Sequence, residues 1–327
     1  MEKKKRPVVG IDVSHLYFDA HWEGCDARYS NDTKGFRKLL KEAPEDAEFV
    51  MEATGNYHYR LSSYIASKGR FVKVVNPLRY TRWTQSEGRK AKTDPEDAID
   101  LAGYAKEKGK KLREWKMLPP KLARAKVIVS QLKGFAKMAA QARCRIHAAK
   151  LVVSKTDYIL NPMSGLLDYC GDMQADLEKE LCKLAGEIYP EHYKLLQSIT
   201  GIGAKTAAVM LVCAKDFASF ETPGKLSAFF GYAVKVHESG KTVKGKTHMV
   251  KVGNSYLRGL LHMCANTAVQ YDAACHNLYE RLRAKGKLAR VAQVAVAHRL
   301  VKIAWGVVNS GEMYRGTKIA RDKKTAA

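Results

Sequence analysis

Apolar residues near the N-terminus fall into short runs that are separated by turn residues. Residues 8–14 and 17–22 form two such runs, and residues 27–30 could add a third after a turn at Gly24. Runs of this length, bounded by turn signals, are typical of β-strands. The pattern therefore predicts that the chain begins with a β-meander.

The next stretch alternates between helical and strand patterns. Apolar residues recur at helical spacing in residues 33–41 and 57–67, while residues 47–52 and 71–75 form short apolar runs. Strands that alternate with helices are typical of a mixed α/β sheet. We therefore expect an α/β domain over residues 1–112.

Beyond this domain the pattern is mainly helical. Residues 121–153 lack proline and carry apolar residues at roughly helical spacing, and residues 172–189 carry them at intervals like those of a coiled coil. We expect a basic helical or coiled-coil connector over residues 113–192. A mainly helical C-terminal domain should follow over residues 193–327.

The charge of the chain is strongly positive. Lys and Arg number 57 against 33 Asp and Glu, which gives a net charge of +24. This excess favours a polyanionic partner, and nucleic acid is the first expectation. Residues 106–150 are especially rich in basic residues, although such a run can also be a solvated helix face.

Membrane attachment and secretion are not expected from this sequence. The basic N-terminus is followed by Asp12 and His15 rather than by a small-residue cleavage site, so a signal peptide is not predicted. The seven cysteines include no Cys-x-x-Cys pair, which argues against a zinc site and favours free thiols. We expect a cytoplasmic protein that associates with the nucleoid when it binds DNA.

Four carboxylates could form a metal site. Asp12 and Glu52 each end a predicted strand, and Asp94 and Asp97 begin a predicted helix three residues apart. Each has an ordinary alternative: a turn residue for Asp12, a surface residue for Glu52 and a helix cap for the Asp94 pair. Mg²⁺ prefers hard oxygen ligands and promotes attack on phosphodiesters. The ordered set therefore favours a Mg²⁺ site over the separate alternatives.

Several segments could contact nucleic acid. Residues 79–90 lack apolar periodicity and predict a mobile basic loop, in which Tyr80 and Trp83, like Trp115 further on, could stack on bases or pack in the core. Residues 201–203 predict the turn of a helix-hairpin-helix, where backbone amides meet a phosphate, or else an ordinary interhelix turn. The candidate contact residues are Arg82, Arg89, Lys90, Lys92, Gly201, Gly203, Lys205, Lys241, Lys244 and Lys246.

Ser239 lies in a basic, glycine-containing loop. Its neighbours in sequence include no obvious general base, and serine beside glycine is common in turns. The chemistry alone therefore favours a turn residue over a nucleophile at this position.

A set of short motifs, taken together, resembles the DEDD recombinases of the IS110 insertion-sequence family over almost the whole chain. The resemblance is specific because the motifs agree in order and approximate spacing. They are Gly10-Ile11-Asp12, Met51-Glu52-Ala53-Thr54-Gly55, Asn76-Pro77, Gln85-Ser86-Glu87-Gly88, Lys92-Thr93-Asp94 with Asp97-Ala98, Ile202-Gly203 with Lys205-Thr206, and Glu238-Ser239-Gly240.

The resemblance implies an N-terminal RuvC-like domain of the RNase H fold, a helical coiled-coil connector and a C-terminal transposase domain. It implies that Asp12, Glu52, Asp94 and Asp97 bind Mg²⁺ and that Ser239 is a nucleophile that forms a covalent phosphoserine link to DNA. It also implies a bridge RNA that pairs with donor and target DNA. The subunits would form a dimer of dimers, with active sites composed from two chains.

Two other functions remain open at this point. A RuvC-type, structure-selective endonuclease would use the carboxylates to activate water and would form no protein–DNA bond. A non-enzymatic RNA- or DNA-packaging protein would use only the basic helices and the hairpin turn.

Overall fold

The computed structural model describes residues 6–53, 55–88, 94–155, 157–215, 217–235, 238–239, 243–244, 248–250 and 252–316. The chain divides into two compact units, Met1–Leu118 and Pro119–Ala327. The division into three domains remains a prediction. Each unit is described by itself.

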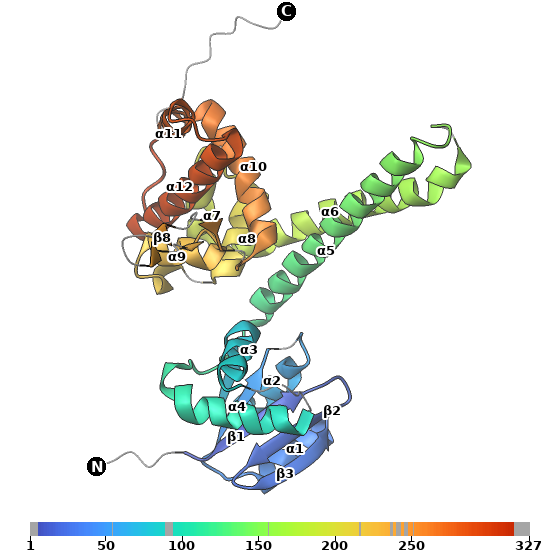
Figure 1. Cartoon of the computed structure of the whole chain (residues 1–327), viewed down its shortest axis with the longest axis vertical. Helices are drawn as coiled ribbons and strands as arrows, with labels where there is room; N and C mark the ends of the chain where they lie inside the picture. Colours follow the sequence, from blue (N-terminus) through green and yellow to red (C-terminus); the bar gives the residue numbers. More distant parts are fainter. Residues whose placement is uncertain are drawn as a thin grey trace, which may run out of the picture. The chain divides into compact units, whose positions relative to one another are not determined.

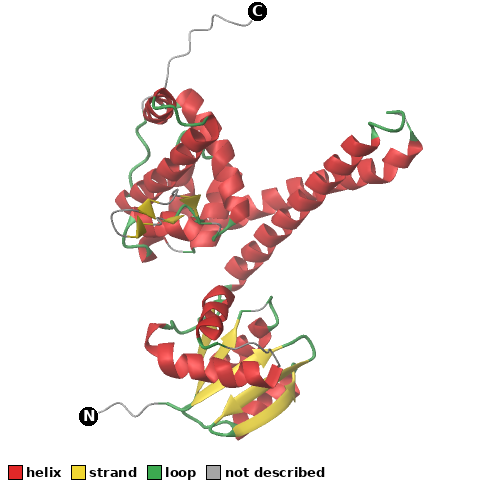
Figure 2. Cartoon of the chain, in the orientation of Figure 1, coloured by secondary structure: helices red, strands yellow, loops and turns green. Residues whose placement is uncertain are grey.

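The first unit is built on a five-stranded mixed sheet (Figures 1 and 2) with strand order β3-β2-β1-β4-β5. Strand β1 pairs antiparallel with β2 and parallel with β4, β2 pairs antiparallel with β3, and β4 pairs parallel with β5. The predicted mixed α/β sheet, with its N-terminal meander, is confirmed. The strands are β1 (Val8–Val13), β2 (Tyr17–Trp22), β3 (Cys25–Ser30), β4 (Glu48–Glu52) and β5 (Phe71–Val75).

Alternation along the strands gives the sheet two covered faces. Val9, Ile11 and Val13 of β1 belong to a core cluster that also contains residues of α1 and α2, whereas Val50 belongs to a second cluster with residues of α3 and α4. Because successive strand residues point to opposite faces, Gly10 lies on the α4 face of β1. The helices of this unit are α1 (Thr33–Glu42), α2 (His58–Ser67), α3 (Pro77–Ser86) and α4 (Asp94–Lys108), followed by the 3₁₀ turn η1 (Gly109–Lys111).

Helix α4 packs directly against the central strand β1. A Cβ atom on Gly10 would lie 2.1 Å from the carbonyl oxygen of Ala98 and 2.5 Å from the amide nitrogen of Ala102. Only glycine allows the backbones of a helix and a strand to approach this closely. The Gly10 contact therefore determines how near α4 comes to the strand that carries Asp12.

The predicted basic loop over residues 79–90 is wrong for most of its length, because helix α3 occupies it as far as Ser86. The side chain of Asn76 caps this helix by accepting hydrogen bonds from the amides of Leu78 and Arg79. Pro77 stands in the first turn, where its fixed φ suits a helix and its missing N–H costs nothing. These two local signals outweigh the weak apolar periodicity of the segment.

The second unit is mainly helical, as predicted. Its first two long helices pack side by side as a hairpin (Figure 1), and the predicted coiled coil remains a prediction. In the described residues between α9 and α10 the structure has four two-residue strands. The elements are α5 (Pro120–Ala149), η2 (Tyr158–Leu160), α6 (Asn161–Ile188), α7 (Pro190–Gln197), α8 (Ala204–Ala214), η3 (Phe217–Ser219), α9 (Pro223–Phe230), β6 (Val234–Lys235), β7 (Glu238–Ser239), β8 (Val243–Lys244), β9 (His248–Met249), α10 (Ser255–Tyr271), α11 (Ala273–Ala284) and α12 (Ala289–Ser310).

Among the described residues, α12 is the one helix long and apolar enough to cross a membrane. Val296, Leu300 and Val301 of this helix are buried, and the helix packs against α9, α10 and α11. A buried central helix of a helical bundle has the same composition. Helix α12 thus serves as the core helix of the second unit.

Candidate active site

Asp12 and Glu52 lie next to each other at the carboxyl ends of parallel strands. The register of β1 and β4 pairs Ile11 with Met51, so the next residue of each strand continues the same alignment. Adjacent strands are about 4.8 Å apart, and aligned residues of parallel strands project to the same face. Both carboxylates are partly buried.

Helix α4 covers the face on which these carboxylates lie. Asp12 is two residues beyond Gly10 and therefore shares its face, against which Ala98 packs. Asp97 directly precedes Ala98 and is partly buried. The first turns of α4 thus lie over the two strand ends.

Tyr80 is a buried residue whose hydroxyl contacts the first turn of α4, near these carboxylates. Tyr80 is 2% exposed, and its hydroxyl donates a hydrogen bond of 3.1 Å to the carbonyl oxygen of Asp97. Its pKa is raised, first by burial and then by four surrounding carboxylates, those of Asp97, Asp100, Glu52 and Asp12. Three of the four predicted acids therefore lie within electrostatic reach of one buried phenol.

Asp100 is an acid near this site that the sequence reasoning missed. It is 4% exposed and lies one helical turn after Asp97. Residues three apart on a helix share a face, so its spacing from Asp97 could have indicated it.

The fourth predicted acid, Asp94, begins α4, but its side chain lies outside the described part of the chain. Among the side chains that are described, no group of three His, Cys, Asp or Glu is close enough to hold an ion. The donor chemistry nevertheless suits a hard divalent cation, which prefers carboxylate oxygens and keeps several waters. Asp12, Glu52 and Asp97 supply such oxygens from two strands and a helix.

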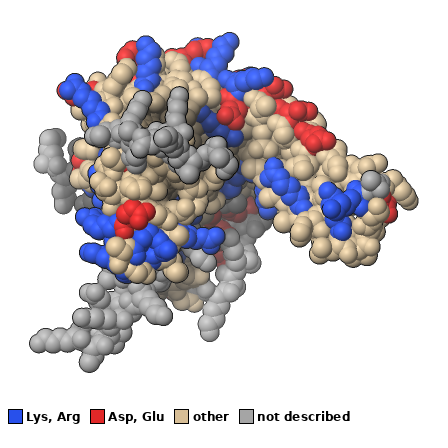
Figure 3. Space-filling model, turned by 90° about the horizontal axis from the view of Figure 1, so that it is seen from above, with Lys and Arg blue, Asp and Glu red and all other residues tan. Residues whose placement is uncertain are grey.

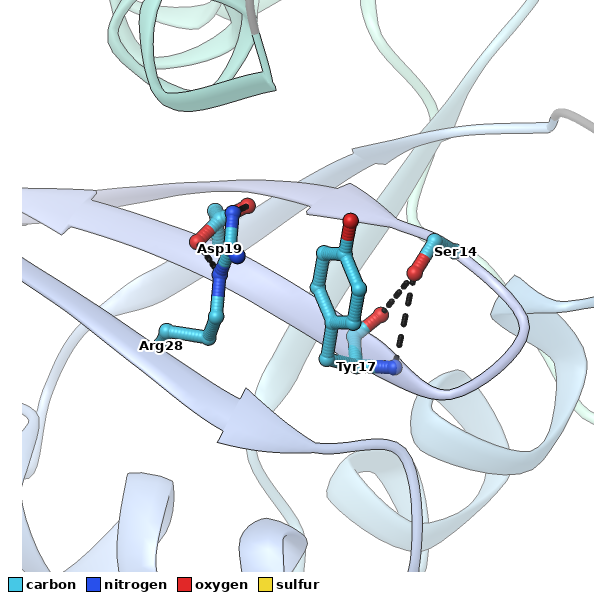
Figure 4. Close-up of polar contacts among 4 residues, drawn as sticks. All are labelled: Ser14, Tyr17, Asp19 and Arg28. Carbon is cyan, nitrogen blue, oxygen red and sulfur yellow. Dashed lines mark hydrogen bonds and ion pairs between the residues drawn. The ribbon is translucent and has the colours of Figure 1, made fainter.

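A further acid, Asp19, lies beside Asp12 on β2. The antiparallel register pairs Asp12 with Asp19, and the next pairing along the sheet joins Asp19 to Arg28 of β3. Figure 4 shows Arg28 directed at Asp19, beside Tyr17 and the turn that begins at Ser14. Ser14 donates its hydroxyl hydrogen to the carbonyl oxygen of Tyr17 at 2.7 Å, which closes this turn.

The candidate serine lies in the second unit. Ser239 forms part of the short strand β7, rather than the predicted loop, and pairs with Val243 of β8. The structure describes only the backbone of this residue. Its role as a nucleophile remains a prediction.

The glycine turn lies between α7 and α8. Gly201 has φ of +93°, and a Cβ on it would lie 2.5 Å from the carbonyl oxygen of Cys264, so it is required for packing against α10. Gly203 caps α8 and has open space around it. Lys205 forms an ion pair of 2.8 Å with Glu178. The turn is therefore partly explained by packing, and phosphate binding there remains a prediction.

The other candidate nucleic-acid contacts are exposed or undescribed. Arg82 is exposed on α3, and only the backbone of Lys244 is described, in β8. Lys and Arg side chains occur on several parts of the visible surface (Figure 3). Five candidates lie outside the described residues: Arg89, Lys90, Lys92, Lys241 and Lys246.

All three aromatic residues considered for base stacking make defined contacts in the first unit. Tyr80 is a core residue, so base stacking by it is excluded. The indole Nε1 of Trp83 donates to Glu107 at 2.7 Å, and Trp115 packs edge-on against Tyr59. Both indoles are only partly buried.

Comparison with known proteins finds two matching family models. Residues 9–151 match the model of DEDD transposases named after IS110, and residues 193–280 match that of the transposase IS116/IS110/IS902 family. The chain is 25% identical over 323 residues to a pilin gene-inverting protein of Moraxella bovis. The aligned region covers 94% of this chain and 97% of that protein. A pilin gene-inverting protein of Moraxella lacunata is also 25% identical, over 322 residues. An uncharacterized 43.6 kDa protein of insertion element IS110 from Streptomyces coelicolor is 31% identical over 120 residues, which are 37% of this chain and 29% of that protein.

Proposed function

Because the chain belongs to the IS110/IS116/IS902 family of transposases, we propose that it is a bridge-RNA-guided, site-specific DNA recombinase. The family exchanges DNA strands, so the chain is an enzyme whose substrate is DNA, and the packaging role considered from the sequence is excluded. Two relatives of nearly the same length are named as inverters of a pilin gene, which supports action at specific DNA sites. The observation that carries the proposal is that Asp12 and Glu52 directly follow the paired residues Ile11 and Met51 of parallel strands, and that Asp97 lies on α4, the helix that packs against β1.

The fold of the catalytic unit is proposed to be RuvC-like. An antiparallel β1-β2-β3 meander that continues through the parallel strands β4 and β5 supports this assignment. In such a sheet the ends of β1 and β4 bring Asp12 and Glu52 together, and α4, which packs on the same face of the sheet, begins with Asp94 and Asp97 in its first turns.

The cation of this family is divalent, and we propose that it is Mg²⁺, held by Asp12, Glu52, Asp94 and Asp97. When bound, a divalent cation neutralises phosphodiester oxygens and orients the attack on phosphorus. The chain itself supplies carboxylate oxygens, and the described residues among these four, Asp12, Glu52 and Asp97, are partly buried. Tyr80 stays protonated because its pKa is raised. Its hydroxyl therefore remains a donor to the backbone of Asp97 and holds the first turns of α4 in place.

Ser239 is proposed as the nucleophile of the exchange. Its hydroxyl oxygen would form a bond to phosphorus while one P–O bond of the DNA backbone breaks, and the serine proton would pass to the departing deoxyribose oxygen, which becomes a free hydroxyl. One phosphodiester bond replaces another, so the step needs no external energy source and can reverse to join a new strand. The motif Glu238-Ser239-Gly240 and the two-part family match support this role.

The proposal extends to partners and location. A net charge of +24 supports the simultaneous binding of DNA and a structured RNA. Base pairing by the RNA would select the sites, while the protein supplies charge and chemistry. We propose a dimer of dimers as the active assembly, acting in the cytoplasm on nucleoid DNA.

Trapping on a denaturing gel tests this function. Full-length chain with its copurified RNA and donor DNA should yield a covalent protein–DNA adduct in Mg²⁺. Ser239→Ala and Asp12→Ala should yield none, whereas Ser130→Ala, at an exposed position of α5, should match the wild type. Strand cleavage without any adduct, retained by Ser239→Ala, would instead support a RuvC-type endonuclease that uses water.

A further inference from the structure

A row of charged residues crosses the sheet from β4 to β3. Glu52 and Asp12 occupy aligned positions on β4 and β1, Asp12 pairs with Asp19 on β2, and Asp19 pairs with Arg28 on β3. Directly opposed residues on neighbouring strands lie on one face, with Cβ atoms about 4.5–5.5 Å apart. A third carboxylate therefore stands beside the two proposed metal ligands, followed by a guanidinium.

Asp19 is held in a closed arrangement. It is 7% exposed, and both of its oxygens accept hydrogen bonds from Arg28, at 2.8 Å from Nε and 2.9 Å from Nη2. The guanidinium carbon of Arg28 lies 4.1 Å from the ring centroid of Tyr17 (Figure 4). This cation–π contact also helps to fix the orientation of the guanidinium. A bidentate, charge-assisted pair of this kind is strongly directional. Asp19 therefore presents its oxygens to Arg28.

The same carboxylate lies directly opposite Asp12, on the neighbouring strand. A cavity of about 220 Å³ is lined by Asp19 and Arg28 together with Ala98, the residue that follows Asp97 on α4. An Asp19 carboxylate not engaged by Arg28 would add a unit of negative charge and two oxygen ligands beside Asp12. It would then compete for the cation.

We propose that the Asp19–Arg28 ion pair is a positioning device that keeps Asp19 out of the metal site. It thereby confines the divalent cation to the side of Asp12 on which Glu52 lies. The inference rests on the proposed function, because it takes Asp12 as a cation ligand. Asp19 and Arg28 act through Asp12.

Binding of Mn²⁺ alone to the full-length chain tests this inference, with free Mn²⁺ measured by electron paramagnetic resonance. Arg28→Met leaves the Asp19 charge uncompensated and should tighten binding about tenfold, the effect of one unit charge on a divalent ion at roughly 6 Å in water-like surroundings. Asp19→Asn removes one negative charge beside Asp12 and should weaken binding by about the same factor. The double variant is neutral again and should return to within about twofold of the wild type.

A charge-retaining variant and a substitute for Arg28→Met complete the set. Arg28→Lys retains the charge but lacks the two-point contact with Asp19, so its Mn²⁺ affinity should lie between those of the wild type and Arg28→Met. Arg28→Gln replaces Arg28→Met if that variant does not fold. The half-saturating Mg²⁺ concentration for DNA cleavage should shift in the same order across the set. A purely structural role for the pair would instead weaken Mn²⁺ binding in Arg28→Met, Asp19→Asn and the double variant alike, and that result would overturn the inference.

Asp12→Asn separates this failure from failure of the proposed function. If Asp12→Asn leaves the affinity for Mn²⁺ unchanged, Asp12 is not a cation ligand and the proposed function itself fails. If Asp12→Asn weakens binding but the opposite shifts of Arg28→Met and Asp19→Asn are absent, only the role of the ion pair is refuted.

Discussion

Replacement of Gly10 by alanine should separate α4 from the strand that carries Asp12. The new methyl carbon would lie 2.1 Å from the Ala98 carbonyl oxygen and 2.5 Å from the Ala102 nitrogen, where approaches under 3.0 Å are essentially never seen. Both obstacles are backbone atoms, so the helix has to move by about 1 Å, at a cost of about 1–3 kcal/mol. Asp97 moves with the helix, and a displacement of this size lowers the cleavage rate by about a hundredfold.

Urea unfolding and the rate of adduct formation measure the two effects of Gly10→Ala. Gly103→Ala is the matched control because it lies in the same helix, where its methyl would meet only the Trp83 ring at 3.6 Å. This control should gain about 0.5–1 kcal/mol in stability from the better helix former and keep its activity. Wild-type stability and activity in Gly10→Ala would refute the placement of α4 against β1.

Two further variants test the second unit. The pKa of His298 is lowered, first by burial and then by Lys302. Because the unfolded chain takes up this proton more readily than the folded chain, the stability of the fold should decrease as the pH drops below about 6.5. The decrease should level off below the lowered pKa of the folded state. His298→Gln should show a smaller drop in melting temperature between pH 7.5 and pH 5.5 than the wild type; an equal drop would contradict the assignment. The hydroxyl of Tyr314 donates a 2.9 Å hydrogen bond to Asp272, which is 1% exposed, so Tyr314→Phe should lose about 1–2 kcal/mol in urea unfolding. Tyr169→Phe, at an exposed tyrosine, should lose nothing, and a loss equal to that of Tyr314→Phe would remove the role of the hydrogen bond.

The strand ends that carry the acids could be predicted from local pattern. Short apolar runs that end in Asp12 and Glu52 define strands, and strands alternating with helices favour parallel pairing, which aligns the two ends. The Asp-Pro-Glu-Asp start of α4 gave the position of Asp97 in the same way. Each of these features depends on residues that are close together in sequence.

Other parts of the site depend on contacts that the local pattern does not encode. The pairing of Asp19 with Asp12 and with Arg28 follows from the register of two hairpins, and a shift of one residue would place Asp19 on the other face. The approach of α4 to β1 depends on Gly10, whose close backbone contact is visible only once the helix is packed. The cap at Asn76 and the burial of Tyr80 formed a helix where weak periodicity indicated a loop.

The most direct test of the metal site is an anomalous difference map from a crystal of the full-length chain soaked in Mn²⁺. We predict a peak about 2.2 Å from carboxylate oxygens of both Asp12 and Glu52, on the face of β1 covered by α4. A map in which Mn²⁺ occupies other sites, while these two carboxylates have no ion between them at millimolar Mn²⁺, would contradict it.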